Sequence, residues 1–373
     1  MLLMVEQAIC GCRNIKRGRH LNPAQRNTQL DWELRAAVRG FVASICASRL
    51  VVADMSELVR VTSVLPLPNL AYWESLMRNE FEFGLAQSTR SAPEKGGWRV
   101  LNSFGRPAQE AEPHRFLTWI DLSSWNGHVR ERTLRTLTGP APNSFFLSLA
   151  VRRLNDWVPQ VRAAAREAVP RLAQATDPEQ VVDMLCAMLP TWTSWGRVDP
   201  SDKQVMMELV SMKAVASELK RRVTGSPCGP MTAVLSQALR TAALDGCLMQ
   251  IAEEAVQPVV RAVAHRTLLA GKAVWVDGHS WRWIDIRYGR KRLDHMFAER
   301  PLQEVPAFLD VLNAAAADRS PIVRRIAAQA LVREMGHLGE AVLPLVRRLA
   351  EDASPSVAER GEFILKRLTA QVG

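Results

Sequence analysis

The stretch Asp318-Arg-Ser-Pro-Ile-Val-Arg-Arg-Ile-Ala-Ala-Gln-Ala-Leu331 contains the signals of a turn followed by a buried helix. Ser320 can cap the helix, and Pro321 fits its first turn, where a missing N–H has no partner to lose. Its apolar positions recur every fourth residue, at Val323, Ala327 and Leu331. Because such positions share one face of a helix, the stretch predicts a helix that packs closely against a neighbour.

The same pattern recurs along the chain. Its valine stands at positions 129, 161, 260, 323 and 357. The intervals between successive valines approximate one, three, two and one units of roughly 32–34 residues. We therefore expect an array of helical hairpins, with degenerate units near residues 194, 227 and 292.

Two columns of the repeat form the buried stripe. The residues four positions after the valine are small, and those eight positions after it are aliphatic. The small column is Thr133, Ala165, Ala264, Ala327 and Gly361, and the aliphatic column is Leu137, Val169, Leu268, Leu331 and Leu365.

A polar column accompanies the stripe. An arginine follows the valine in four segments, as Arg130, Arg162, Arg261 and Arg324, and Ala358 ends the column. Asp156 and Asp318 each stand six residues before one of these arginines. A carboxylate in a turn accepts charge-assisted hydrogen bonds from a guanidinium. We expect each aspartate to bind an arginine of its own or the next unit and so to join the repeats.

The Asp-x-x-Pro-x-Val-Arg-x-x-Ala-x-x-Ala-Leu pattern resembles HEAT repeats of the Armadillo-type α-solenoid class, as found in bacterial HEAT-repeat domain proteins. The resemblance covers residues 115–373 and is strongest at 155–170 and 318–365. It implies an all-α fold, a right-handed α-solenoid of HEAT-like helical hairpins. Such solenoids are mostly interaction platforms without a shared catalytic residue, so the resemblance implies partner binding without a cofactor.

The remainder of the chain suggests two further regions. Residues 1–30 carry five basic residues against one acidic residue, and we expect a disordered basic tail. Residues 31–114 show helical patterning, and we expect an irregular helical section with a loop at 86–114. The repeat array would then occupy residues 115–373.

Composition indicates the cellular environment and excludes some classes of protein. The formal net charge is +10, and 40 of the 48 basic residues are arginines. No apolar run is long enough to span a membrane. The six cysteines include only one close pair, Cys10 and Cys12, without a histidine cluster that would complete a metal site. We expect reduced thiols, no metal and a cytoplasmic location.

The segment near 272–290 departs from the helical pattern. The Asp277-Gly278 pair is a turn signal between β-prone residues, which predicts a short hairpin or extended insertion. Basic and aromatic residues then interleave densely, and we select as binding candidates Trp281, Arg282, Trp283, Arg287, Tyr288, Arg290, Lys291 and Arg292. The competing interpretation is that the tryptophans pack the insertion onto the array and the basic residues are solvated.

We expect a non-enzymatic scaffold that binds a protein partner through its concave face and this insertion. Solvent-facing arginines of the array that could contribute are Arg135, Arg266, Arg325 and Arg333. The alternative is nucleic-acid binding, including the chemistry of HEAT-like alkylpurine DNA glycosylases, which use tryptophans and an aspartate. Trp195 and Asp199 have the spacing of one helix face, although Gly196 and Pro200 favour a loop. The oligomeric state stays open.

Overall fold

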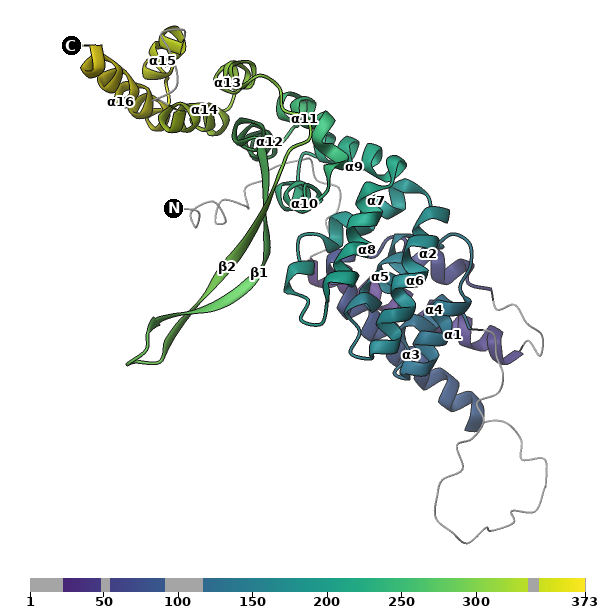
Figure 1. The fold of residues 1–373 in the computed structure, drawn as a ribbon. Helices are drawn as coiled ribbons and strands as arrows, with labels where there is room; N and C mark the ends of the chain where they lie inside the picture. Colours follow the sequence, from purple (N-terminus) through teal and green to yellow (C-terminus); the bar gives the residue numbers. More distant parts are fainter. Residues whose placement is uncertain (1–22, 48–53, 91–116, 335–341, 373) are drawn as a thin grey trace, which may run out of the picture.

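The computed structural model describes residues 23–47, 54–90, 117–334 and 342–372. These residues are mainly helical and include one two-stranded antiparallel sheet, which agrees with the expected all-α class. Figure 1 shows an elongated body of short helices from which one long hairpin projects. The first helices are α1 (Pro23–Ala47), α2 (Ser56–Thr62) and α3 (Leu70–Arg90).

From α4 onward the helices alternate between two rows. Contacts join neighbours in the first row through α4, α6 and α8 and again from α10 to α16, and in the second row from α5 to α15. The first row comprises α4 (Gly127–Thr136), α6 (Pro159–Ala175), α8 (Pro200–Ser211), α10 (Met231–Ala238), α12 (Pro258–Ala270), α14 (Pro321–Glu334) and α16 (Pro355–Val372). The second row comprises α5 (Ser144–Arg152), α7 (Pro178–Met188), α9 (Lys213–Gly225), α11 (Leu248–Glu254), α13 (Phe308–Ala317) and α15 (Leu343–Ala350).

Each copy of the repeated motif begins a first-row helix. The motif valines of α6, α12, α14 and α16 are fully buried. Gly361 of α16 shows why the column four positions later is small. A Cβ at that position would lie 2.3 Å from the backbone nitrogen of Ala350 in α15, so any side chain would force the two helices apart.

The uneven spacing of the motif has two origins. Between residues 161 and 260 the first row contains α8 and α10, which begin close to the degenerate units expected near 194 and 227. Between residues 260 and 323, all of which the structure describes, there is no additional unit. The expectation of one near residue 292 is wrong, because Arg292 lies in a β-strand.

The hairpin consists of β1 (Lys272–Asp285) and β2 (Arg290–Pro301). It extends beyond the expected insertion near 272–290, and its chain reverses at residues 286–289 rather than at the Asp277-Gly278 pair. Gly278 instead lies at a shift in strand register, where its φ of +148° favours glycine. An Asp-Gly pair serves a bulge as well as a turn, so this local signal was ambiguous.

Arginine–aspartate pairs with little solvent exposure join successive units. The pairs are Arg130 with Asp156, Arg261 with Asp318 and Arg324 with Asp352, with N···O distances of 2.6–2.9 Å. In each pair Nε and Nη2 donate to the carboxylate, while Nη1 donates to a backbone carbonyl six residues before the arginine. Each carboxylate thus binds the arginine of the preceding unit, whereas we expected one from its own or the next unit.

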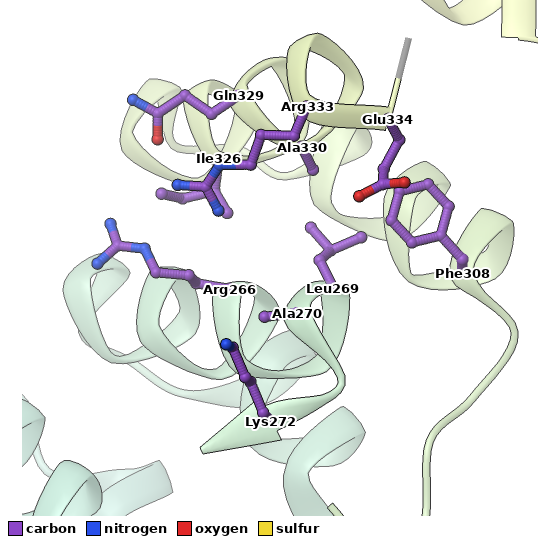
Figure 2. Close-up of a pocket in the computed structure, with 10 residues that line it drawn as sticks. All are labelled: Arg266, Leu269, Ala270, Lys272, Phe308, Ile326, Gln329, Ala330, Arg333 and Glu334. Atoms are coloured by element: carbon purple, nitrogen blue, oxygen red, sulfur yellow. The ribbon is translucent and has the colours of Figure 1, made fainter. Parts of the chain in front are cut away.

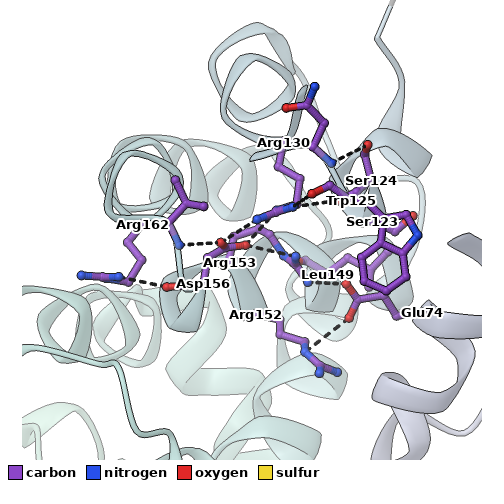
Figure 3. Close-up of polar contacts among 12 residues, drawn as sticks. Glu74, Ser123, Ser124, Trp125, Arg130, Leu149, Arg152, Arg153, Asp156 and Arg162 are labelled. Atoms are coloured by element: carbon purple, nitrogen blue, oxygen red, sulfur yellow. Dashed lines mark hydrogen bonds and ion pairs between the residues drawn. The ribbon is translucent and has the colours of Figure 1, made fainter. Parts of the chain in front are cut away.

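Figure 3 shows the first of these pairs at the junction with the N-terminal helices. Arg153 bonds Asp156 at 3.2 Å and Glu74 of α3 at 2.5 Å. Arg162, in the same unit as Asp156, reaches only the backbone carbonyl of that aspartate. The network therefore connects α3 to the first repeat units.

The sequence separation of the pairs identifies the hairpin as an insertion. The separations are 26, 57 and 28 residues in chain order. The second separation exceeds the other two by about the length of the segment from Lys272 to Pro301. The long interval between the motif valines at 260 and 323 is therefore one ordinary unit interrupted by the hairpin.

The link at Arg162 is incomplete. Its Nε lies 4.0 Å from a carboxylate oxygen of Asp202 and has no hydrogen-bond partner within the described ranges. Asp202 instead accepts a hydrogen bond from Arg166 at 2.8 Å. Because Asp202 stands inside α8 rather than in the preceding turn, the unit of α8 is out of step with the others.

Several expectations fall at the edges of the described ranges. α1 begins at Pro23, so the end of the expected tail is helical, and residues 1–22 lie outside the described residues. α3 continues to Arg90, so residues 86–90 of the loop expected at 86–114 are helical, and the rest of that loop lies outside the described residues. The four described cysteines are free thiols, of which Cys46 and Cys228 are exposed. Within the described segments no helix combines the length and apolar character needed to cross a membrane.

We expect the loss of Asp318 to open the interface between α12 and α14. Asp318→Ala leaves the fully buried Arg261 side chain without its carboxylate, which costs about 3 kcal/mol or more. Hydrogen exchange of the α12 and α14 amides measures this cost locally. Asp352→Ala should cost less, because its partner Arg324 is partly exposed. Equal effects of the two substitutions would contradict the role of burial.

We also expect the protein to lose stability between pH 7 and pH 5 through His265, which is buried in α12. Burial lowers the pKa of His265 to about 4, the carboxylate of Asp318 opposes this shift, and Arg261 adds to it. The unfolded chain binds the proton near pH 6.5, so acid favours unfolding throughout this window, by about 2 kcal/mol at pH 5. Thermal unfolding at both pH values measures the loss. The variant His265→Gln should lose clearly less, and an equal loss would refute the assignment.

Candidate binding surface on the hairpin

The hairpin leaves the helical body at the end of α12. Gly271 follows α12 with a left-handed backbone (φ +61°), and its carbonyl accepts a hydrogen bond from the N–H of Leu302 after β2. Glycine permits this reversal without a Cβ clash. In Figure 1 the hairpin extends beside α10, on the side of the first row and away from α11 and α13.

Strand pairing divides the outer hairpin into two faces. Side chains alternate between faces along a strand, and directly paired residues share a face. One face carries the pairs His279–His295, Trp281–Leu293 and Trp283–Lys291. The other carries Ser280–Asp294 and Arg282–Arg292. The candidate tryptophans are thus separated from Arg282 and Arg292, which only the strand register could reveal.

The first face carries four large apolar side chains that are each about half or more exposed. Trp281, Trp283, Leu293 and Phe297, which we call the aromatic face, have exposed fractions of 66, 49, 48 and 53 %. The ammonium of Lys291 lies 4.0 Å from the ring centroid of Trp283. Large apolar side chains grouped at one surface mark an interaction site more often than single exposed ones do.

The end of the hairpin is basic. Arg282, Arg287, Arg290, Lys291 and Arg292, which we call the basic tip, are all exposed, as is Tyr288 in the turn. Asp294 pairs with Arg292 at 2.6 Å, while Asp285 accepts hydrogen bonds from the backbone N–H groups of Arg287 and Tyr288. Arg282 lies directly opposite Arg292, an arrangement of like charges that destabilises a strand pair. The pairing of Arg282 with Arg292 therefore does not itself stabilise the hairpin.

A polar network that sequence reasoning missed fixes the base of the hairpin. Arg240 donates to the carboxylate of Asp277 at 2.7 Å and to the carbonyl of Val276 at 2.8 Å. Lys203 of α8 donates to the same carboxylate at 3.0 Å. Although burial raises the pKa of Asp277, these two cations hold it below its ordinary value. Helix α8 and the turn after α10 thus bind one aspartate of β1.

Aromatic rings complete this network. The guanidinium of Arg240 lies 4.7 Å from the ring of Trp192 and 5.5 Å from that of Trp275. Gln237 accepts a hydrogen bond from the indole of Trp192 at 2.9 Å and donates to the hairpin backbone. On the other strand, Arg300 bonds both carboxylate oxygens of Asp245, at 2.6 and 2.8 Å. Trp275 therefore packs the hairpin onto the body, whereas Trp281 and Trp283 do not.

The structure separates the arginines expected on the face of the array. Arg135 forms ion pairs with Glu131 at 3.2 Å and with Glu167 at 3.0 Å. Arg266 and Arg333 line a groove between α12 and α14, far along the array from Arg135. Of the four expected arginines, Arg135 is therefore neutralised, whereas Arg266 and Arg333 lie together at the groove. Arg325 stands on the same helix as Arg333.

Asp199, the aspartate considered for glycosylase chemistry, caps α8. Its carboxylate accepts hydrogen bonds from the backbone N–H groups of Ser201 and Asp202, both at 3.1 Å. Trp195 precedes it in extended backbone, so the two residues share no helix face. Among the described residues there is also no group of three or more histidine, cysteine or acidic side chains that could hold a metal ion.

Comparison with known proteins finds no matching family model, no matching curated protein and no matching solved structure.

We expect Arg240→Ala to loosen the hairpin while the helices stay folded. The substitution removes the hydrogen bonds to Asp277 and Val276 and the cation between the two tryptophans. Losing about 2 kcal/mol of charged hydrogen bonding should raise amide exchange in β1 and β2 roughly thirtyfold. Hydrogen exchange resolved by segment measures the change. Arg135→Ala is the control, and unchanged hairpin exchange in Arg240→Ala would show that the base network does not hold it.

Proposed function

We propose that the protein is a non-enzymatic HEAT-like scaffold that binds a protein partner through the aromatic face of its hairpin. In this proposal the two helical rows form a right-handed α-solenoid in the cytoplasm, whose concave face adds contacts. The observation that carries the proposal is the pair Trp281 and Trp283, which are 66 and 49 % exposed on a hairpin with a fixed base.

The helical body supports the scaffold part of the proposal. Except between α8 and α10, helices of one row contact the next helix of the same row, and arginine–aspartate pairs join successive units. Both features are typical of arrays in which each repeat contacts only its neighbours. Such arrays present long surfaces and serve mainly as platforms for partners.

The hairpin supports the choice of a protein partner. Tryptophan and arginine dominate the binding energy of protein interfaces, and both occur here at high exposure. The network around Arg240 and Asp277 orients the hairpin before binding. A preoriented surface loses less conformational entropy on association, which favours affinity.

Nucleic-acid binding is the second candidate, and the basic tip favours it. A two-stranded antiparallel ribbon fits the major groove of DNA, and arginines on it can contact phosphates or bases. The glycosylase version of this candidate has less support, because the carboxylate of Asp199 is engaged in capping α8.

Capture experiments with three variants test the proposal. Tagged protein is incubated with extract of its native cells, with and without nuclease. Replacing both Trp281 and Trp283 by Ser should weaken capture of the partner about thirtyfold or more, because two central tryptophans are lost. Replacing both Trp125 and Trp157, which are equally exposed on the helical body, by Ser is the control and should leave capture unchanged.

The third variant separates the two candidates. Replacing Arg290, Lys291 and Arg292 by Ala should weaken capture of a protein partner less than the loss of the tryptophans does, with helical circular dichroism unchanged. Release of the partner by nuclease, or binding that weakens steeply with salt and depends mainly on these three residues, would support nucleic acid instead. Full capture by the variant without Trp281 and Trp283 would refute the proposal.

A further inference from the structure

A groove between α12 and α14 is cationic at one end and apolar at the other. Figure 2 shows Arg266 of α12 and Arg333 of α14 extending into the same end, where Gln329 also lies. The other end is lined by Leu269, Ala330 and Phe308, and the carboxylate of Glu334 lies beside the Phe308 ring.

No ion pair among the described residues neutralises the arginines of this groove, and the acidic residue of its lining, Glu334, lies at the other end. Arg266, Arg325 and Arg333 take part in none of the ion pairs found among the described residues. The Nε of Arg325 is buried without a hydrogen-bond partner there. Burial lowers the pKa of Arg266, and the nearby charges of Arg333 and Arg325 lower it further. The remaining cation in the lining, Lys272, is paired with Glu299 at 2.9 Å.

Comparison with an equivalent unit shows which acidic partner Arg266 lacks. Arg135 and Arg266 both stand six residues after the motif valine of their units. The same position of the next described unit is Glu167 for Arg135, and the two bond at 3.0 Å. For Arg266 it is Gln329, which carries no charge. The arginine at this repeat position is therefore neutralised in the unit of α4, where it is Arg135. In the unit of α12, where it is Arg266, the equivalent acidic partner is absent.

We propose that the groove binds a phosphate monoester, with Arg266 and Arg333 holding the phosphate and the apolar end holding its organic part. Guanidinium groups bind phosphate through paired, charge-assisted hydrogen bonds. Arg266 and Arg333 at one end of the groove, with the charge of Arg325 nearby, are balanced better by a dianion than by a single carboxylate. The site is separate from the hairpin surface and does not depend on the function proposed for it.

Titration of the full-length protein with phenyl phosphate tests the inference. Isothermal titration in a phosphate-free buffer should show saturable binding, and the ligand should raise the unfolding temperature. Gln329→Glu supplies the carboxylate that Glu167 provides elsewhere, and it should weaken binding at least about tenfold without loss of stability. Arg266→Gln should weaken binding similarly.

Matched controls make the result decisive. Arg135→Gln removes the same charge outside the groove and should leave binding unchanged, and the uncharged substitution Gln329→Leu should weaken binding much less than Gln329→Glu does. Absence of saturation up to roughly 10 mM phenyl phosphate would overturn the inference. Equal binding of benzoate would overturn the assignment to phosphate in favour of a carboxylate. Binding that survives both Gln329→Glu and Arg266→Gln would place the ligand elsewhere.

Discussion

A guanidinium that is removed from water must find a carboxylate, and in this protein the carboxylate comes from the following repeat unit. Arg261 is fully buried, and its only acidic partner among the described residues is Asp318. A slip between neighbouring units would leave a buried charge without compensation, which is far more costly than a lost surface contact. The arginine–aspartate pairs therefore specify how successive units stack, while the buried apolar stripe packs the helices against one another.

This constraint also explains how the array accommodates the hairpin as an insertion. The hairpin enters after α12 and returns before α13, and the pair Arg261–Asp318 closes the unit around it. The network of Arg240, Asp277 and Trp192 then holds the base of the hairpin against the neighbouring unit. The body thus stays continuous, and the outer hairpin can carry side chains that the fold itself does not need.

Much of the architecture could be predicted from local patterns. The motif placed the start of five first-row helices correctly, because proline, valine and small residues at helical spacing act within one element. The hairpin was recognised from its composition, but its turn was misplaced, because Asp-Gly suits a bulge as well as a turn. The degenerate unit expected near residue 292 does not exist, because the interval from Val260 to Val323 fits two units as well as one unit with an insertion. Arg240, Gln237 and Trp192 were missed because no sequence pattern relates them to residues 276 and 277.

The sequence by itself determined the helical class, the length of the repeat and the composition of the hairpin, since each of these depends on residues close together in the chain. Only the tertiary structure decided which charges are neutralised. Arg135 and Arg266 occupy the same position in their units, yet one faces Glu167 and the other Gln329. Whether an arginine is structural or available for a ligand depends on a partner in another repeat unit, at a distance that folding alone sets.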